Sequence, residues 1–121
     1  MFSIDSRSRV AIYEQLVQNI IGLIARGVLQ PDDQLPSVRN LARDLGINPN
    51  TVQKAYQELE AKGMIYQAAG RGSFIAPGES LTDSIVQQKL KEARPPILSA
   101  ERAGVPRERM LALVDEIYEK E

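Results

Sequence analysis

The sequence contains no cysteine and no histidine among its 121 residues. Without cysteine there can be no disulfide framework and no thiolate metal site. Without histidine, the commonest metal ligand and the usual general base are both missing. These absences argue against most enzyme classes, and we expect no catalytic residues, no metal site and no cofactor.

Long apolar runs are missing as well. No stretch approaches the ~18 residues of a transmembrane helix, and the charged start MFSIDSRSR has no apolar core of a signal peptide. The cytoplasm is therefore the expected location. Hydrophobic residues make up 43% of the chain and charged residues 26%, an ordinary balance for one globular domain with or without an appendage.

An excess of one charge is the third feature that the chain lacks. Its formal net charge is −1 at pH 7. Up to Gly78, eight Lys and Arg stand against seven Asp and Glu, and from Glu79 onward seven stand against nine. The overall field is too weak to indicate a nucleic-acid partner, so any such prediction must rest on local geometry.

The residues that are present predict a mainly α-helical fold with one small β-hairpin. A first helix is expected over residues 10–26, and a last helix is expected to open at Pro106. Ser37 and Gly46 are suited to the start and the end of a second helix. The apolar positions that the first two helices would bury are Ile12, Leu16, Ile20, Leu23, Ile24, Val38, Leu41, Ala42 and Leu45.

A third helix and the hairpin follow. Asn48 can cap the helix, Pro49 falls at its first position, where a missing N–H costs nothing, and the helix should run to about Lys62. Two short strands are expected over residues 64–67 and 73–76, joined by a glycine-rich turn. This order of helices and hairpin is that of a winged helix-turn-helix.

The chain after the hairpin is predicted to be helical. Ser80 can cap a fourth helix, and Pro95 and Pro96 should interrupt it because neither residue can donate a helical hydrogen bond. A short helix over residues 97–103 would then follow.

The third helix carries an unusual polar stripe. Its members are three, four and seven residues apart and lie ~200° around the helix from the predicted buried set. A solvated helix face usually carries Glu and Lys, whereas the first two turns here offer Asn, Thr, Gln and one Lys. Such groups can hydrogen-bond base edges in the major groove. The alternative is an ordinary helical hairpin. The stripe consists of Asn50, Gln53, Lys54 and Gln57.

Two further groups of residues favour DNA. Arg39 and Arg43 are four apart on the second helix and can hold phosphates beside the groove, although arginines so placed also pair with acids such as Asp44. Arg71 lies between two glycines at the hairpin tip, where it can approach a phosphate or the minor groove. An incidental arginine in a glycine-rich turn is the alternative. The complete candidate DNA-binding set is Arg39, Arg43, Asn48, Pro49, Asn50, Thr51, Gln53, Lys54, Gln57, Gly70, Arg71 and Gly72.

The apolar faces after the hairpin exceed what two short helices can hide from water. Pairing with a second copy would cover them, and a palindromic DNA site needs a two-fold protein. The alternative is that both helices fold back onto their own chain. We expect a DNA-binding domain over residues 1–78 and a helical dimerisation segment over residues 79–121. The candidate interface residues are Leu81, Ile85, Leu90, Met110, Leu111, Val114 and Ile117.

The motifs IYEQL, LPSVRNLARDLGINPNTVQKAYQELEAKG and GRGSFI resemble those of the GntR-type bacterial transcription regulators, and INPNTVQKAY resembles their YtrA-like branch. The resemblance covers roughly residues 12–75. It implies DNA contacts by Arg39, by residues 49–53 and at Gly70, and dimerisation through C-terminal helices. Many relatives carry Arg where this chain has Pro49 or Gln53. Because Arg favours guanine and Gln favours adenine, the base preference does not carry over.

The sequence thus predicts a dimeric winged-helix repressor that binds double-stranded DNA at a palindromic operator. The competing class is a winged-helix protein-interaction module, which the near-zero net charge favours. A small-molecule-binding protein would need a pocket of ~300–1,000 Å³, and residues 80–121 are too few to enclose one. The operator and any small-molecule effector do not follow from the sequence.

Overall fold

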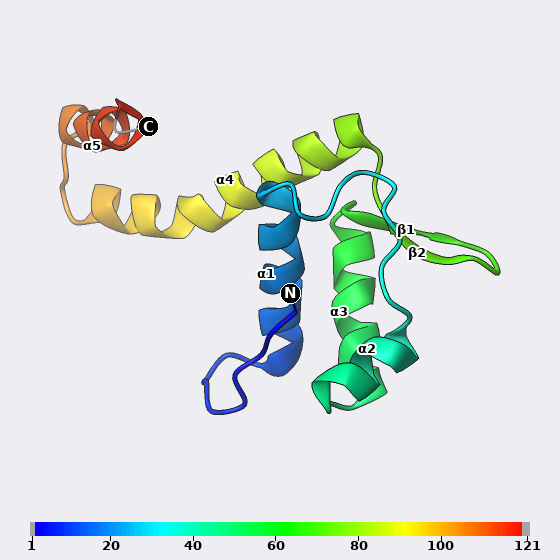
Figure 1. The fold of residues 1–121 in the computed structure, drawn as a ribbon. Helices are drawn as coiled ribbons and strands as arrows, with labels where there is room; N and C mark the ends of the chain where they lie inside the picture. The colour runs from blue at the N-terminus through cyan, green and yellow to red at the C-terminus, as the bar shows by residue number, and fades with distance from the viewer. Residues whose placement is uncertain (1, 120–121) are drawn as a thin grey trace. The chain divides into compact units, whose positions relative to one another are not determined.

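The computed structural model describes residues 2–119, and its elements have the predicted order (Figure 1). The chain divides into two compact units, here called unit 1, up to Gln87, and unit 2, from Gln88 onward. A mainly helical fold with one antiparallel hairpin is confirmed. The elements are α1 (Ile12–Ala25), α2 (Val38–Leu45), α3 (Pro49–Ala61), β1 (Ile65–Ala68), β2 (Gly72–Ile75), α4 (Gly78–Arg102) and α5 (Arg107–Glu119).

The ends of α2 and α3 are set by local chemistry, as predicted. The Ser37 hydroxyl accepts a hydrogen bond from the backbone N–H three residues later, at 3.1 Å. Gly46 ends α2 with a φ of +67°, a conformation that glycine adopts without steric cost. The Asn48 side chain accepts from the Asn50 N–H at 2.8 Å, and Pro49 is the first residue of α3. The turn between the two helices is therefore closely defined.

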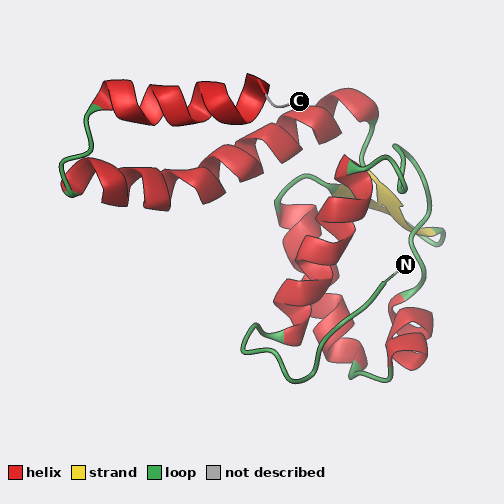
Figure 2. Cartoon of the chain, turned by 60° about the vertical axis from the view of Figure 1, so that its left-hand side comes forward, coloured by secondary structure: helices red, strands yellow, loops and turns green. Residues whose placement is uncertain are grey.

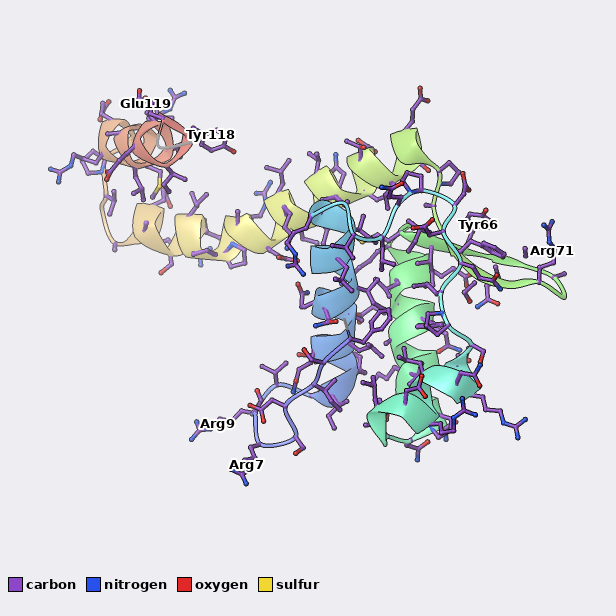
Figure 3. The ribbon with its side chains drawn as sticks, viewed as in Figure 1. Arg7, Arg9, Tyr66, Arg71, Tyr118 and Glu119 are labelled. Carbon is purple, nitrogen blue, oxygen red and sulfur yellow. The ribbon has the colours of Figure 1, made fainter. Side chains whose placement is uncertain are left out.

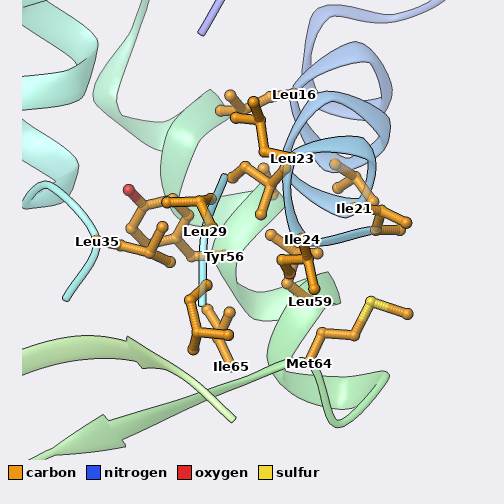
Figure 4. Close-up of a cluster of buried hydrophobic side chains, with 14 of the residues drawn as sticks. Leu16, Ile21, Leu23, Ile24, Leu29, Leu35, Tyr56, Leu59, Met64 and Ile65 are labelled. Atoms are coloured by element: carbon orange, nitrogen blue, oxygen red, sulfur yellow. The ribbon is translucent and has the colours of Figure 1, made fainter. Parts of the chain in front are cut away.

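The core of unit 1 lies where α1 packs against α3, with α2 and the hairpin closing it (Figure 4). Tyr56 is 1% exposed, and its hydroxyl donates to the Pro36 carbonyl at 2.8 Å. That bond satisfies the one polar atom of the side chain within the core. The largest fully buried side chains are Tyr56, Leu16, Ile20, Ile21, Leu59, Met64, Ile75, Val17 and Val52.

The hairpin begins and ends within one residue of the prediction. Ile65 pairs with Ile75, and Ala68 pairs with Gly72 (Figure 2). The segment before α2 runs along the other edge of β2, because the Leu35 N–H donates to the Ser73 carbonyl at 2.8 Å. The outer edge of β2 is thus covered by backbone of its own unit.

Helix α4 corrects two expectations about its course. Ser80 does not cap it, because the helix begins at Gly78 and the Ser80 hydroxyl donates to the Pro77 carbonyl at 3.1 Å. Pro95 and Pro96 do not interrupt it, because α4 continues through both to Arg102. The fixed φ of proline is itself helical, and this turn is exposed, so water can replace the two missing donors.

The first turns of α4 belong to unit 1. Leu81 is 5% exposed and lies in the core, and Ile85 packs against the same core. The expectation that these two residues lie in a subunit interface is therefore corrected: their own chain covers them, since the core leaves an apolar surface at this point. The compact unit also extends beyond the expected boundary at Gly78.

Unit 2 consists of the remainder of α4 and of α5, and none of its described residues is buried. The opening of α5 directly after Pro106 is as predicted. Its apolar side chains face solvent: Leu90 is 62% exposed, Leu111 47% and Ile117 54%. Among the helices that the structure describes, none has the length and apolar character needed to cross a membrane.

Candidate nucleic-acid interface

The two faces of α3 are separated as the sequence predicts. Asn50, Lys54 and Gln57 are exposed, and Thr51 and Gln53 are half-buried on the outer side. The inner side is occupied by Val52, Ala55, Tyr56 and Leu59, all of them buried. The outer face is therefore free of core packing, and its amide, hydroxyl and ammonium groups are open to a ligand.

The start of α3 favours a negatively charged partner. Its first turn contains no acidic residue, and its N-terminal N–H groups carry the positive end of the helix dipole. Asn48 is exposed and uses its side-chain oxygen for the cap, which leaves its amide N–H₂ as a donor. The electrostatic preference here is local, in keeping with a net charge near zero.

Lys54 makes a contact that the sequence did not indicate. Its Nζ lies 3.9 Å from the centroid of the Tyr13 ring, on α1. Tyr13 in turn donates from its hydroxyl to a Glu14 carboxylate oxygen at 3.2 Å, and that bond raises the pKa of Tyr13. The aromatic ring holds the ammonium group in place on the outer face of α3 without neutralising it.

The two arginines of α2 are both exposed, as predicted. Arg43 Nε lies 3.8 Å from an oxygen of Asp44, in a pair whose side chains are 71% and 66% exposed. Such a solvent-exposed pair contributes little free energy, so Arg43 is readily released to another anion. The Arg39 side chain has no hydrogen bond or ion pair with any described residue.

The wing, which is the hairpin β1–β2, presents Arg71 at its tip (Figure 3). Gly70 and Gly72 have φ values of +74° and +117°. Gln34 Nε2 donates to the Arg71 carbonyl at 2.8 Å, and a Cβ at Gly72 would come within 3.0 Å of the same Gln34 atom. Gln34 therefore braces the tip, and the missing side chain at Gly72 makes room for it.

The base of the wing is held by a second contact that the sequence did not indicate. The Tyr66 ring stacks on Phe74 with centroids 5.5 Å apart. The Tyr66 hydroxyl donates to an Asp32 carboxylate oxygen at 2.9 Å, which raises the pKa of Tyr66. Asp32 itself has a φ of +66°, which is uncommon for a residue other than glycine. These contacts tie the wing to the segment before α2.

These residues form a surface with an exposed polar helix face, exposed arginines on the preceding helix and a braced basic tip. It combines donors and acceptors for base edges with cations for phosphates, the two kinds of contact that protein–DNA interfaces use. Tyr13, Gln34, Asp32 and Tyr66 were missed because each acts through a partner more than thirty residues away.

Comparisons with known proteins agree with this geometry. The model of the family described as "Bacterial regulatory proteins, gntR family" matches residues 12–75, more than half of the chain. The HTH-type transcriptional repressor YtrA of Bacillus subtilis is 40% identical over 122 residues, which make up 97% of this chain and 92% of YtrA.

Two solved structures extend the comparison. A GntR family transcriptional regulator from Listeria monocytogenes has 30% sequence identity and a TM-score of 0.73, over 93% of this chain and 98% of that one. AraR(DBD) in complex with operator ORE1 has 28% identity and a TM-score of 0.54, over 63% of this chain and 93% of that one. The chain thus belongs to the gntR family of bacterial regulatory proteins and is a winged-helix transcriptional regulator, not an enzyme.

Proposed function

We propose that this regulator is a homodimeric repressor that binds a palindromic DNA operator through α3 and the wing. The observation that carries the proposal is the outer face of α3, whose amide, hydroxyl and ammonium groups are exposed and lie opposite the buried face. The 40% identity to a repressor over nearly the whole chain supports it, as does the likeness to AraR(DBD) in complex with its operator.

Each part of the surface has its own role in the proposal. Asn50, Thr51, Gln53 and Gln57 would contact base edges, and Lys54 would reach bases or phosphates from its place over Tyr13. Backbone phosphates would be held by Arg39 and Arg43, by the donors at the start of α3, and by the wing. The proposed DNA-binding residues are Arg39, Arg43, Asn48, Pro49, Asn50, Thr51, Gln53, Lys54, Gln57, Gly70, Arg71 and Gly72.

The test begins with selection of bound sequences from a random DNA pool, which should return a two-fold symmetric site. Arg39→Ala should then weaken binding to that site by roughly 1–3 kcal/mol in a titration at fixed salt, because a phosphate contact is lost. The exposed position of Arg39 means that thermal unfolding should not change. Recovery of no sequence from the pool, or equal affinity of Arg39→Ala and wild type, would contradict the proposed interface.

The proposed dimer forms through unit 2, whose exposed apolar side chains would be covered by a second copy. Residues Leu90, Met110, Leu111, Val114 and Ile117 remain in the proposed interface. Replacing Leu111 and Val114 by Glu should give a monomer in sedimentation, with a large loss of operator affinity. Ala112→Glu, on the opposite face of α5, is the matched control and should leave the dimer intact. A double variant that still sediments as a dimer would place the interface elsewhere.

The second candidate function is a winged-helix module that binds another protein, which the near-zero net charge favours. The two functions differ in salt dependence. Operator binding should weaken steeply with added salt as counterions are released, whereas a protein–protein contact of ordinary composition should not. Binding to DNA would place the regulator in the cytoplasm, where an unidentified effector molecule would release it.

A further inference from the structure

The segment before α1 has a defined conformation, held by one glutamine. Gln15 Nε2 donates to the carbonyl of Asp5 at 2.9 Å and to that of Val10 at 2.8 Å. Gln15 Oε1 accepts from the Asp5 N–H at 2.7 Å. All three bonds join the first turns of α1 to the two ends of a short loop. We call this loop, residues 5–10, the arm.

The tip of the arm presents two arginines. The backbone is folded by local bonds, in which the Asp5 carboxylate accepts from the Arg7 N–H at 2.9 Å and Ser8 Oγ accepts from the Val10 N–H at 3.1 Å. Arg7 and Arg9 are exposed, and their side chains extend away from the unit (Figure 3). Asp5 is the one acid of the arm, so the loop carries a local excess of positive charge.

The position of the arm relates it to the candidate interface. The arm leads directly into α1, and Tyr13, in the first turn of α1, lies under Lys54 of the outer face of α3. In the ribbon views the arm is at the same end of unit 1 as the start of α3, with the wing on the other side of that helix (Figures 1 and 2). The two arginines therefore flank α3 on the side away from Arg71.

We propose that the arm is a further DNA-binding element, in which Arg7 and Arg9 contact backbone phosphates beside the segment read by α3. The proposal rests on the proposed function, because it requires α3 to lie on the duplex. Gln15 acts as a positioning residue: it fixes the arm before DNA arrives, so that less conformational freedom is lost on binding. The partner is double-stranded DNA, and the contact carries no sequence information.

The test compares the Arg7→Ala/Arg9→Ala double variant with wild type on the selected operator. The double variant should bind about tenfold or more weakly at fixed salt, and the slope of log affinity against log salt should fall by about 2, roughly 1 for each lost phosphate contact. The bases selected from the random pool should not change. Arg7→Lys/Arg9→Lys keeps both charges and should retain most of the affinity.

Two further variants separate position from charge. Arg26→Ala removes an exposed arginine after the last turn of α1, at the far end of that helix from the arm, and should leave affinity and salt slope unchanged. Gln15→Ala keeps both arginines but frees the arm, and should weaken binding by less than the double alanine variant. If Arg26→Ala weakens binding as much as the double variant, only overall charge matters, and the proposed role of the arm is wrong.

The inference and the proposed function fail in different ways. If wild type selects an operator and depends on Arg39, but the double alanine variant keeps wild-type affinity and salt slope, the arm does not bind DNA. If wild type selects no DNA at all, the proposed function itself fails. Thermal unfolding of each variant shows whether the fold is retained, and the lysine variant decides the question if the alanine variant is unstable.

Discussion

Units 1 and 2 use similar amphipathic helices but cover them differently. In unit 1 the apolar stripe of α1 packs against α3, and Leu16 and Ile20 are fully buried. In unit 2 no described residue is buried, although α5 carries Leu111, Val114 and Ile117. An apolar stripe therefore predicts that a helix needs a partner without saying whether that partner lies in the same chain.

Helix α4 shows the same contrast within a single element. Leu81, near its start, is 5% exposed and belongs to the core of unit 1, whereas Leu90 is 62% exposed in unit 2. The two leucines are nine residues apart on one helix and have the same intrinsic hydrophobicity. Their different burial follows from what each has beside it: the core of unit 1 lies against the first, and solvent surrounds the second.

The sharpest test of this comparison truncates one leucine or isoleucine in each unit. Ile20→Ala removes a fully buried side chain and should lower the free energy of unfolding by about 2–5 kcal/mol, because lost burial adds to a residual cavity. Leu90→Ala, measured in a dilute sample, should change it by less than about 0.5 kcal/mol. Urea denaturation followed by circular dichroism checks both. Equal losses would show that unit 2 has a core of its own.

A second test uses a glycine from each unit. Gly72→Ala places a Cβ within 3.0 Å of Gln34 Nε2 at a φ of +117°, and should cost about 1–3 kcal/mol with faster amide exchange in the wing. Gly104→Ala, at a φ of +92° with no other atom near its Cβ, should cost about 1 kcal/mol and leave exchange in the wing unchanged. Faster wing exchange in Gly104→Ala would mean that the units are coupled.

The smallest expected difference concerns a tyrosine hydroxyl in each unit. Tyr56→Phe removes the donor to the Pro36 carbonyl and should cost about 0.5–1.5 kcal/mol, whereas Tyr118→Phe, at a side chain 75% exposed, should have no effect. Burial raises the pKa of Tyr56. Its contribution to stability is therefore present below about pH 10 and is lost as the unfolded tyrosine ionises above it. That loss should be smaller in Tyr56→Phe.

Much of the fold was predictable because its signals are local. Ser37, Gly46 and Asn48 mark helix ends through hydrogen bonds and backbone conformations that involve only nearby residues. The outward position of the polar stripe on α3 follows from helical periodicity, and it is confirmed. The identities of the DNA-contacting residues stay predictions.

The errors and omissions concern contacts between distant residues. Pro95 and Pro96 were expected to break a helix because propensity describes an average environment, whereas this exposed turn can exchange its lost bonds for water. The bond from Gln34 to the wing tip and the place of Tyr13 under Lys54 depend on which elements are neighbours in space. No spacing in the sequence encodes either contact.

The sequence by itself determined the helices, their caps, the hairpin and the polar face of α3, since each depends on periodicity or on groups a few residues apart. Only the tertiary structure decided that Leu81 serves the core while Leu90 does not, that Gln34 and Asp32 brace the wing, and that the arm lies beside α3. The physical reason is that burial and long-range hydrogen bonds belong to pairs of residues, and the chain order does not state which pairs meet.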